Sequence, residues 1–374
     1  MNFPKFRTSS PPPLVGRLDA LTGLRWWAAF AVFAFHARNF APLPGYGLMT
    51  YGHYGVSFFF VLSGFVLTWS AKPTVTVRQF WFRRFARIWP AAMVALLIAI
   101  PIFHPWWHTS QSPWEKPFSL PVIALSILFL QGYSTRPEIL FSGNPAAWTL
   151  SCEFLFYFMH PLVNGLTSRW GKRGNLALFW ATVLVATIIN FLGLNSLPLP
   201  FLRLWEFFLG MAVANALRWG WRPRIPVSGT YILIVGLMLI PWSPIARHLP
   251  SSLINLIFLF QPVLFGVFFA LMIAATAYRQ MLKKPTIMDR WILVKGGEWS
   301  YCFYLVHASV IYVLRDLFGQ QPAGHIGTNL CWWLLIFILG LAVTALLHLL
   351  VEKPAEKYLR AWGDNKFGVK NRDH

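Results

Sequence analysis

Two ionisable side chains, Arg25 and His36, interrupt an otherwise apolar stretch near the start of the chain. In a helix, eleven residues at 100° each end about 20° past three full turns, so both side chains would lie on one face, about 16 Å apart along the axis. An imidazole can take a proton as a general base, and a guanidinium can hold an anion. A structural interpretation stays open, in which Arg25 extends to a lipid interface and His36 bonds a backbone carbonyl.

A lone carboxylate, Glu153, lies in another apolar stretch. We expect it near the outer surface of a membrane, at a depth comparable with His36. A carboxylate beside a histidine fixes the tautomer of the ring and stabilises its charged form. Glu153 is therefore predicted to be a catalytic partner of the imidazole. The alternative is a structural ion pair with Arg203 or Arg38.

Three polar residues recur at helical spacing late in the chain, at positions i, i+4 and i+7: Ser300, Tyr304 and His307. This spacing predicts a polar stripe on one helix face, turned toward the interior of a bundle. Such a stripe could contact a substrate. Hydrogen bonding between helices explains it equally well.

A basic segment, residues 72–87, contains three arginines that share helix faces in pairs. Arg83 and Arg87 are four residues apart, and Arg84 and Arg87 are three apart. Forked guanidinium groups suit phosphates, so we predict these three as binding residues for a phosphate-bearing cofactor or donor. Plain attraction to anionic lipid is the alternative.

A segment rich in tryptophan, residues 104–117, includes the pair Trp106 and Trp107. Their rings could stack on a sugar or a macrocycle, which makes them candidate substrate contacts. An aromatic belt at a membrane interface would use the same residues.

The elements that must position these residues follow from composition. Of 374 residues, 56% are hydrophobic and only 12% are charged, too few charges for a soluble surface and too little polarity for disorder. The net charge of +20 comes from short clusters between apolar runs, which favours membrane loops over nucleic-acid binding. Cys152, Cys302 and Cys331 have no zinc-site spacing, so neither a metal nor a disulfide is predicted.

Eleven apolar segments predict an all-α, polytopic membrane helix bundle. They are 22–40, 53–71, 88–104, 119–133, 147–167, 175–193, 200–217, 228–246, 253–278, 300–318 and 328–351. Residues 119–133 would cover only about 22 Å as a helix, less than the ~30 Å hydrocarbon core. If this segment does not cross, 26 of the 32 Lys and Arg fall on one side, as the positive-inside bias requires.

We therefore predict about ten transmembrane helices and one short re-entrant or interfacial segment. Both termini would lie in the cytoplasm. The expected division is a cytoplasmic N-terminal segment (1–21), a membrane domain (22–351) and a cytoplasmic C-terminal tail (352–374). The first 16 residues lack the apolar run of a signal peptide, so we expect no cleaved leader.

In their order along the chain, seven motifs resemble those of the acyltransferase family 3 membrane proteins. They are RLDALTGLRWWAAFAVFAFH, GHYGVSFFFVLSGFVL, FWFRRFARIWP, AWTLSCEFLFY, LRLWEFFLGM, GEWSYCFYLVH and VEKP, and together they span residues 17 to 354. Members of that family move an acyl group, often acetyl, from cytosolic acyl-CoA to a hydroxyl of a carbohydrate or another acceptor, including macrolide antibiotics.

The resemblance implies an integral O-acyltransferase of the cytoplasmic (inner) membrane. Arg25 and His36 would form its essential pair, Arg84 and Arg87 would bind donor phosphates, and Glu153 would occupy the family's acidic position. The donor would be acyl-CoA, first of all acetyl-CoA, and the acceptor a carbohydrate, glycolipid or glycoside.

Within this scheme His36 acts as general base, and an acyl-histidine intermediate is the second route. Many members have Asp where this chain has Ser57, and some carry a C-terminal hydrolase-like domain that has no counterpart in the present sequence. The competing function is a transporter or flippase of a lipid-linked glycan, using the same buried charges without covalent chemistry.

Overall fold

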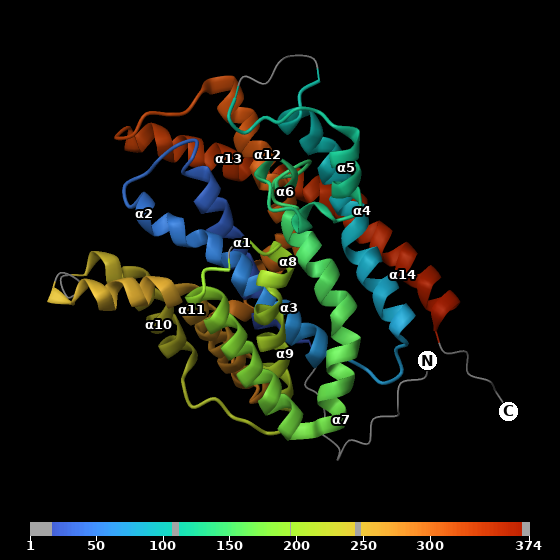
Figure 1. Cartoon of the computed structure of the whole chain (residues 1–374). Coiled ribbons are helices and arrows are strands. Elements are labelled where there is room, and N and C mark those ends of the chain that lie inside the picture. The colour runs from blue at the N-terminus through green and yellow to red at the C-terminus, as the bar shows by residue number, and fades with distance from the viewer. Residues whose placement is uncertain (1–16, 107–111, 195, 244–247, 369–374) are drawn as a thin grey trace.

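The computed structural model describes residues 17–106, 112–194, 196–243 and 248–368 (Figure 1). Across these residues the regular structure is helical throughout, with no strand, which confirms the predicted all-α class. The helices are α1 (Asp19–Ala37), α2 (Tyr46–Met49), α3 (Gly55–Trp69), α4 (Val77–Phe103), α5 (Leu120–Ile127), α6 (Pro137–Leu140), α7 (Trp148–Phe191), α8 (Leu199–Leu202), α9 (Leu204–Arg218), α10 (Val227–Leu239), α11 (Ser251–Met281), α12 (Trp291–Phe318), α13 (Ile326–Leu347) and α14 (Lys353–Phe367). Short 3₁₀ turns add η1 (Thr50–Tyr54), η2 (Gln131–Tyr133), η3 (Ile240–Trp242) and η5 (Ile287–Asp289), and η6 (His348–Glu352) is a π-helical turn.

Six helices in the described part of the chain are long and apolar enough to cross a membrane. One of them, the 44-residue α7, bends at Gly171, where φ is +61°, and so covers two predicted spans, 147–167 and 175–193. The helices α9 and α10 have 15 and 13 residues and fall short by length. The protein is thus a multi-pass membrane bundle, and the count of ten spans stays a prediction.

The segment expected to be re-entrant forms α5, which has eight residues and covers only about 12 Å. The chain then turns inward, and Gln131, Ser142 and Asn144 are buried. Asn144 Nδ2 donates to the carbonyl of Leu305, half-way along α12, at 2.7 Å. Irregular backbone at membrane depth is tolerated where protein surrounds it. The consequence is that α7 begins inside the bundle rather than at its surface.

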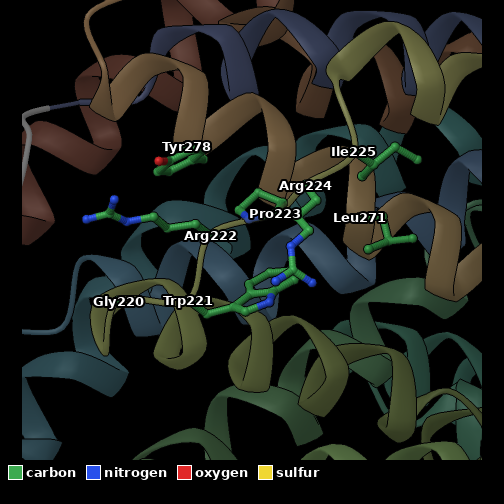
Figure 2. Close-up of a pocket in the computed structure, with 8 residues that line it drawn as sticks. All are labelled: Gly220, Trp221, Arg222, Pro223, Arg224, Ile225, Leu271 and Tyr278. Atoms are coloured by element: carbon green, nitrogen blue, oxygen red, sulfur yellow. The ribbon is translucent and has the colours of Figure 1, made fainter.

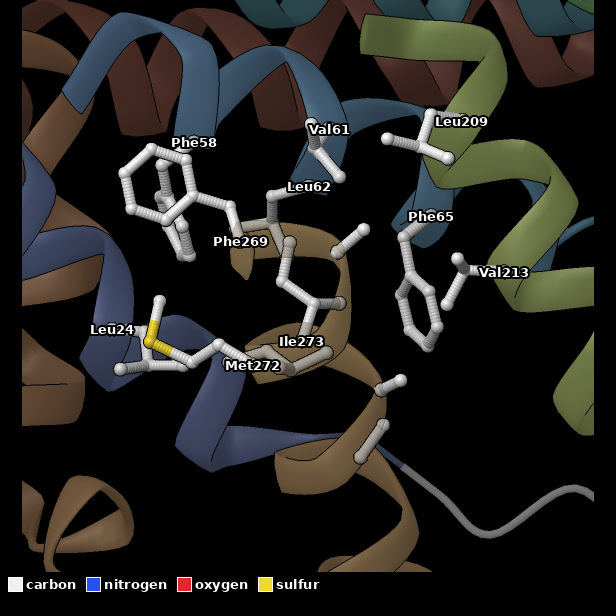
Figure 3. Packing of buried hydrophobic residues seen from close by; sticks show 14 of the residues in the cluster. Leu24, Phe58, Val61, Leu62, Phe65, Leu209, Val213, Phe269, Met272 and Ile273 are labelled. Carbon is white, nitrogen blue, oxygen red and sulfur yellow. The ribbon is translucent and has the colours of Figure 1, made fainter. Parts of the chain in front are cut away.

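The centre of the bundle is a close crossing of α3 and α9. A Cβ on Gly64 would lie 1.9 Å from the carbonyl oxygen of Phe207, and one on Gly210 would lie 1.9 Å from that of Val61. Two glycines therefore let the backbones touch, as is typical of membrane helix packing. Figure 3 shows the apolar cluster beside this crossing, where α3 and α9 meet α1 and α11.

Most of the segment expected to be a C-terminal tail is helical. After the π turn η6, α14 runs back along α4 (Figure 1). Asp364 accepts from Gln79 Nε2 at 2.9 Å and pairs with Arg83 at 2.7 Å. The ring of Trp362 lies 5.2 Å from that of Phe82. Residues 353–367 are therefore a packed helix that holds one face of α4.

Candidate active site

Helix α1 carries both Arg25 and His36 on one unbroken 19-residue helix, as the spacing predicts. It lies directly against α12, because a Cβ on Gly297 would meet the carbonyl oxygen of Thr22 at 1.7 Å. Thr22 lies beside Gly297 and His36 lies beside His307, so the two helices run in the same direction. The faces that carry the predicted polar residues thus meet along their length.

At the far end of α1, the ring of His36 faces the ring of His307. Their centroids are 5.1 Å apart and the planes are inclined by 50°. His307 is 1% exposed, whereas His36 is only half-buried. The Nδ1 atom of His307 lies 2.6 Å from the carbonyl oxygen of Tyr304, and its Nε2 atom has no partner among the described residues.

At the near end of α1, Arg25 lines a narrow cavity of about 50 Å³. Glu153 of α7 lines it too, together with Ser300 and Tyr304 of α12. Its remaining walls come from α3, α7 and α12. They are the apolar or aromatic side chains Val56, Phe59, Phe60, Leu150 and Tyr301, and the hydroxyl-bearing Thr149. The lining of this small cavity therefore includes Arg25 and Tyr304, which lies one helical turn before His307, but neither His36 nor His307.

The position of Glu153 corrects the expectation that it lies at the depth of His36. Its carboxylate interacts electrostatically with Arg25, Arg84 and Arg87, and it accepts from the hydroxyl of Tyr157 at 2.9 Å. The reason is the inward fold of residues 131–147, which lets α7 begin deep in the bundle. The partner of the His36 ring in the described structure is His307.

Two of the three arginines predicted to bind phosphate are paired with carboxylates. Arg83 contacts Asp364 at 2.7 Å, and Arg87 contacts Glu352 at 2.8 Å and Glu356 at 2.5 Å. Arg84 differs, because its Nε is buried and has no hydrogen-bond partner among the described residues. Of the three arginines, Arg84 is therefore the one whose donor is left over for a bound anion.

The buried carboxylate of Glu352 also collects two further groups. Cys302 Sγ lies 2.9 Å and His348 Nδ1 2.6 Å from its Oε2. These three residue types can ligate zinc, and their ligand atoms all lie within 4.8 Å of one another. His348 and Glu352 are four residues apart in one helical turn, but Cys302 belongs to another helix, so spacing alone did not indicate the three residues as a group. In the described structure Arg87 already contacts the second carboxylate oxygen.

The remaining predicted contacts are less closely gathered. Ser300 Oγ donates to the carbonyl of Gly297 at 2.8 Å, and the Tyr304 hydroxyl donates to that of Ala146 at 3.0 Å, so both hydroxyls bond backbone. Trp106 is 62% exposed and its ring lies 6.1 Å from that of Phe118. Trp107 lies outside the described residues.

A larger cavity of about 780 Å³ lies elsewhere, between the α9–α10 connection and α11 (Figure 2). Its walls include Trp221, Arg222, Arg224 and Tyr278. The sequence indicated these arginines only as topology charges. In Figure 1 the α10–α11 pair stands on the opposite side of the bundle from α4 and α14. The described lining of this cavity includes neither a histidine nor a carboxylate.

A protein-family model described as an acyltransferase domain matches residues 18–349. The chain belongs to this acyltransferase family. It is 34% identical to acyltransferase MdmB of Streptomyces mycarofaciens over 93% of this chain and 94% of that protein. It is 25% identical to nodulation protein 10 of Rhizobium leguminosarum bv. viciae over 89% of this chain and 92% of that protein.

A third relative shares only part of its length. The peptidoglycan O-acetyltransferase OatA of Listeria monocytogenes serovar 1/2a is 37% identical over 43% of this chain and 26% of its own length. No solved structure matches the chain. Membership of the family confirms the acyltransferase class expected from the sequence, and it decides against a transporter as the main function.

Proposed function

We propose that this membrane enzyme is an O-acyltransferase that moves a short acyl group, first of all acetyl, from acyl-CoA to a hydroxyl of a carbohydrate, glycolipid or glycoside. The observation that carries the proposal is that α1 and α12 pack together so that Arg25 and Tyr304 line one small cavity while His36 and His307 face each other further along the same two helices. Family membership and the O-acetyltransferase among the relatives support the same chemistry.

The donor would enter from the cytoplasm, with both termini on that side of the inner membrane. Its phosphates would bind Arg84 and Arg25, because forked guanidinium donors suit phosphate oxygens. The buried Nε of Arg84, which has no partner, fits such an anion. Arg83 and Arg87 would act mainly by fixing α4 against α14 through their carboxylates. The pantetheine arm would then follow the aromatic cavity toward His36.

Transfer would proceed with His36 as general base. One nitrogen of its ring takes the proton of the acceptor hydroxyl as the oxygen attacks the thioester carbonyl carbon. The C–S bond breaks, and His36 returns the proton to the departing thiolate of CoA. An acyl-histidine intermediate is the alternative route, in which the ring nitrogen attacks first.

The acceptor would approach the half-buried side of His36. The exposed ring of Trp106 could supply a stacking surface for a sugar or a macrocycle. Glu153 would serve the charged end of the cavity by holding the guanidinium of Arg25 in place, rather than by orienting the histidine.

The test uses membranes containing the full chain, acetyl-CoA radiolabelled in the acetyl group, and two acceptor classes, a glycosylated macrolide and a cell-surface polysaccharide. Label appearing in the acceptor, and absent with His36→Ala, is the expected result. His36→Ala retaining full transfer would rule out both histidine routes. If no label enters either acceptor, and if CoA release does not exceed that of membranes without the protein, the proposed function is contradicted.

A further inference from the structure

The tautomer of His307 is fixed by its own helix. Its Nδ1 lies 2.6 Å from the carbonyl oxygen of Tyr304. A carbonyl oxygen only accepts, so this nitrogen must carry a hydrogen and donate it. In the neutral ring the lone pair then resides on Nε2. That nitrogen is buried and has no hydrogen-bond partner among the described residues.

A buried acceptor without a partner is costly, and where one persists a function or a missing partner is the usual explanation. The nearest ring is that of His36, with its centroid 5.1 Å away. Each imidazole nitrogen lies about 1.1 Å from its ring centre, so two nitrogens that face each other along the line between the centres would be about 2.9 Å apart, an ordinary hydrogen-bond distance. The proposed bond requires the His36 ring to turn until one of its nitrogens faces Nε2 of His307.

No carboxylate competes for this position in the described part of the chain. The charged or titratable groups that act on His36 are His307 and Arg38, whereas His307 interacts with the backbone of Tyr304 and Phe303. The acid expected to hold the catalytic ring, Glu153, interacts with the arginines instead. No carboxylate among the described residues is therefore placed to orient the His36 ring. The titratable side chain whose ring faces His36 is His307.

We propose that His307 is the positioning residue of His36, accepting an N–H of the His36 ring at Nε2 so that the other His36 nitrogen is presented as base to the acceptor hydroxyl. The inference rests on the proposed acyl transfer. During the reaction the imidazolium that forms on His36 keeps its bond to the Nε2 lone pair of His307, which stabilises that charge. The Tyr304 carbonyl fixes the His307 ring, and the His307 ring in turn fixes the His36 ring. The backbone of α12 thereby sets one orientation of His36.

Two amide substitutions separate this role from simple packing. In His307→Gln the side-chain oxygen can occupy the position of Nε2 and accept from His36. In His307→Asn the amide occupies the position of Nδ1 and leaves nothing opposite His36. Ser309→Ala is the matched control, because Ser309 is a buried polar residue of the same helix whose hydroxyl has no partner.

We expect kcat for acetyl transfer to fall by about 100-fold in His307→Asn and by less than about 10-fold in His307→Gln, with the KM for acetyl-CoA unchanged in both. Ser309→Ala should match the wild type. Equal losses in the two amide variants, or a change confined to KM, would overturn the inference. If the wild-type chain itself transfers nothing, the proposed function has failed, and the following measurement still tests the pair.

That measurement is made on full-length protein labelled with ¹⁵N-histidine in lipid bilayers, by solid-state NMR. The signals of the two rings are assigned by comparison with His36→Gln and His307→Gln protein, among ten histidines in the chain. An N–H···N scalar coupling between a His36 nitrogen and a His307 nitrogen is expected. Two rings without that coupling would contradict the inference, whatever the activity of the variants.

Discussion

The two ends of α1 differ in how their ionisable groups are compensated. Around Arg25, arginines from α1 and α4 converge on carboxylates from α7, η6 and α14, so nearly every charge has an opposite partner. Around His36, two imidazoles face each other and no carboxylate joins them in the described structure. One end is therefore suited to hold an anion, and the other to move a proton between neutral groups.

The carboxylates near Arg25 also determine which arginine of α4 is left without an ion pair and could bind a further anion. Removing one partner of a buried ion pair leaves an uncompensated charge, which is strongly destabilising. Arg87 and Arg83 are tied to carboxylates and hold α4 to its neighbours. Arg84 contacts none of these carboxylates and keeps a buried donor. Arginines paired with carboxylates and an arginine proposed to bind the donor thus share one helix, a distinction that charge counting alone does not make.

The largest expected effect tests the end of α1 that carries His36. His36→Ala removes the base, and acyl transfer is expected to fall by about 1,000-fold, because general acid–base catalysis typically contributes 10²–10⁴. The assay follows radiolabelled acetyl groups into the acceptor. His325→Ala, which changes an exposed histidine at the start of α13, is the control and should keep wild-type activity. Transfer within a few-fold of the wild-type rate would show that the His36 end of α1 takes no part in the mechanism.

The next effect separates the two ends. Arg84→Ala should raise the KM for acetyl-CoA by about 10- to 100-fold with little change in kcat, because a charge-assisted hydrogen bond to phosphate contributes about 1.5–3 kcal/mol. Steady-state kinetics with varied donor concentration measure it. Arg78→Ala removes the same charge from an exposed position of α4 and serves as control. A fall in kcat alone would mean that Arg84 acts at the reacting atoms instead.

A third substitution tests whether the carboxylates that pair with the arginines stabilise the fold. Glu352→Ala removes a fully buried carboxylate that Arg87, Cys302 and His348 share. We expect the free energy of unfolding to drop by about 3 kcal/mol. Denaturant titration in detergent micelles measures it. Glu356→Ala, which leaves Arg87 paired with Glu352, should lose only about 1 kcal/mol, and equal losses would contradict the distinct role of Glu352.

The smallest expected effect concerns the contact between α14 and α4 at Asp364. Asp364→Ala frees Gln79 and Arg83, and because the pair is partly exposed its loss should be within about 1 kcal/mol. The sensitive readout is faster tryptic cleavage in α14, which would pack less firmly on α4. Lys357→Ala, at an exposed position of the same helix, should not speed cleavage elsewhere in α14. An unchanged cleavage rate for Asp364→Ala would show that apolar packing alone holds α14.

Much of the fold is readable from hydropathy, because lipid makes helical spans obligatory. Every predicted apolar segment coincides with a helix, and the short segment 119–133 contains α5, which is too short to cross. Hydropathy could not show that α7 would be one bent helix, or that residues 353–367 pack as α14. Both depend on contacts between distant parts of the chain, such as that between Arg83 and Asp364.

The site was predictable where spacing along one helix decides the geometry. Arg25 and His36 share α1, and Ser300, Tyr304 and His307 share α12, as their periods indicate. Partners on different helices were not predictable. Glu153 contacts the arginines and not His36, because the inward fold of residues 131–147 shifts the start of α7. The contact between His36 and His307 depends on the close packing of α1 and α12, where Gly296 and Gly297 of α12 lie against Trp26 and Thr22 of α1.

The division of labour along α1 is tested most directly by measuring donor binding and turnover on the same His36→Ala protein. Equilibrium binding of radiolabelled acetyl-CoA should match the wild type, since the arginine end is intact, while transfer of the acetyl group is lost. If His36→Ala protein no longer binds acetyl-CoA, or binds it and still transfers the acetyl group, then the two ends of α1 do not have the separate roles assigned to them.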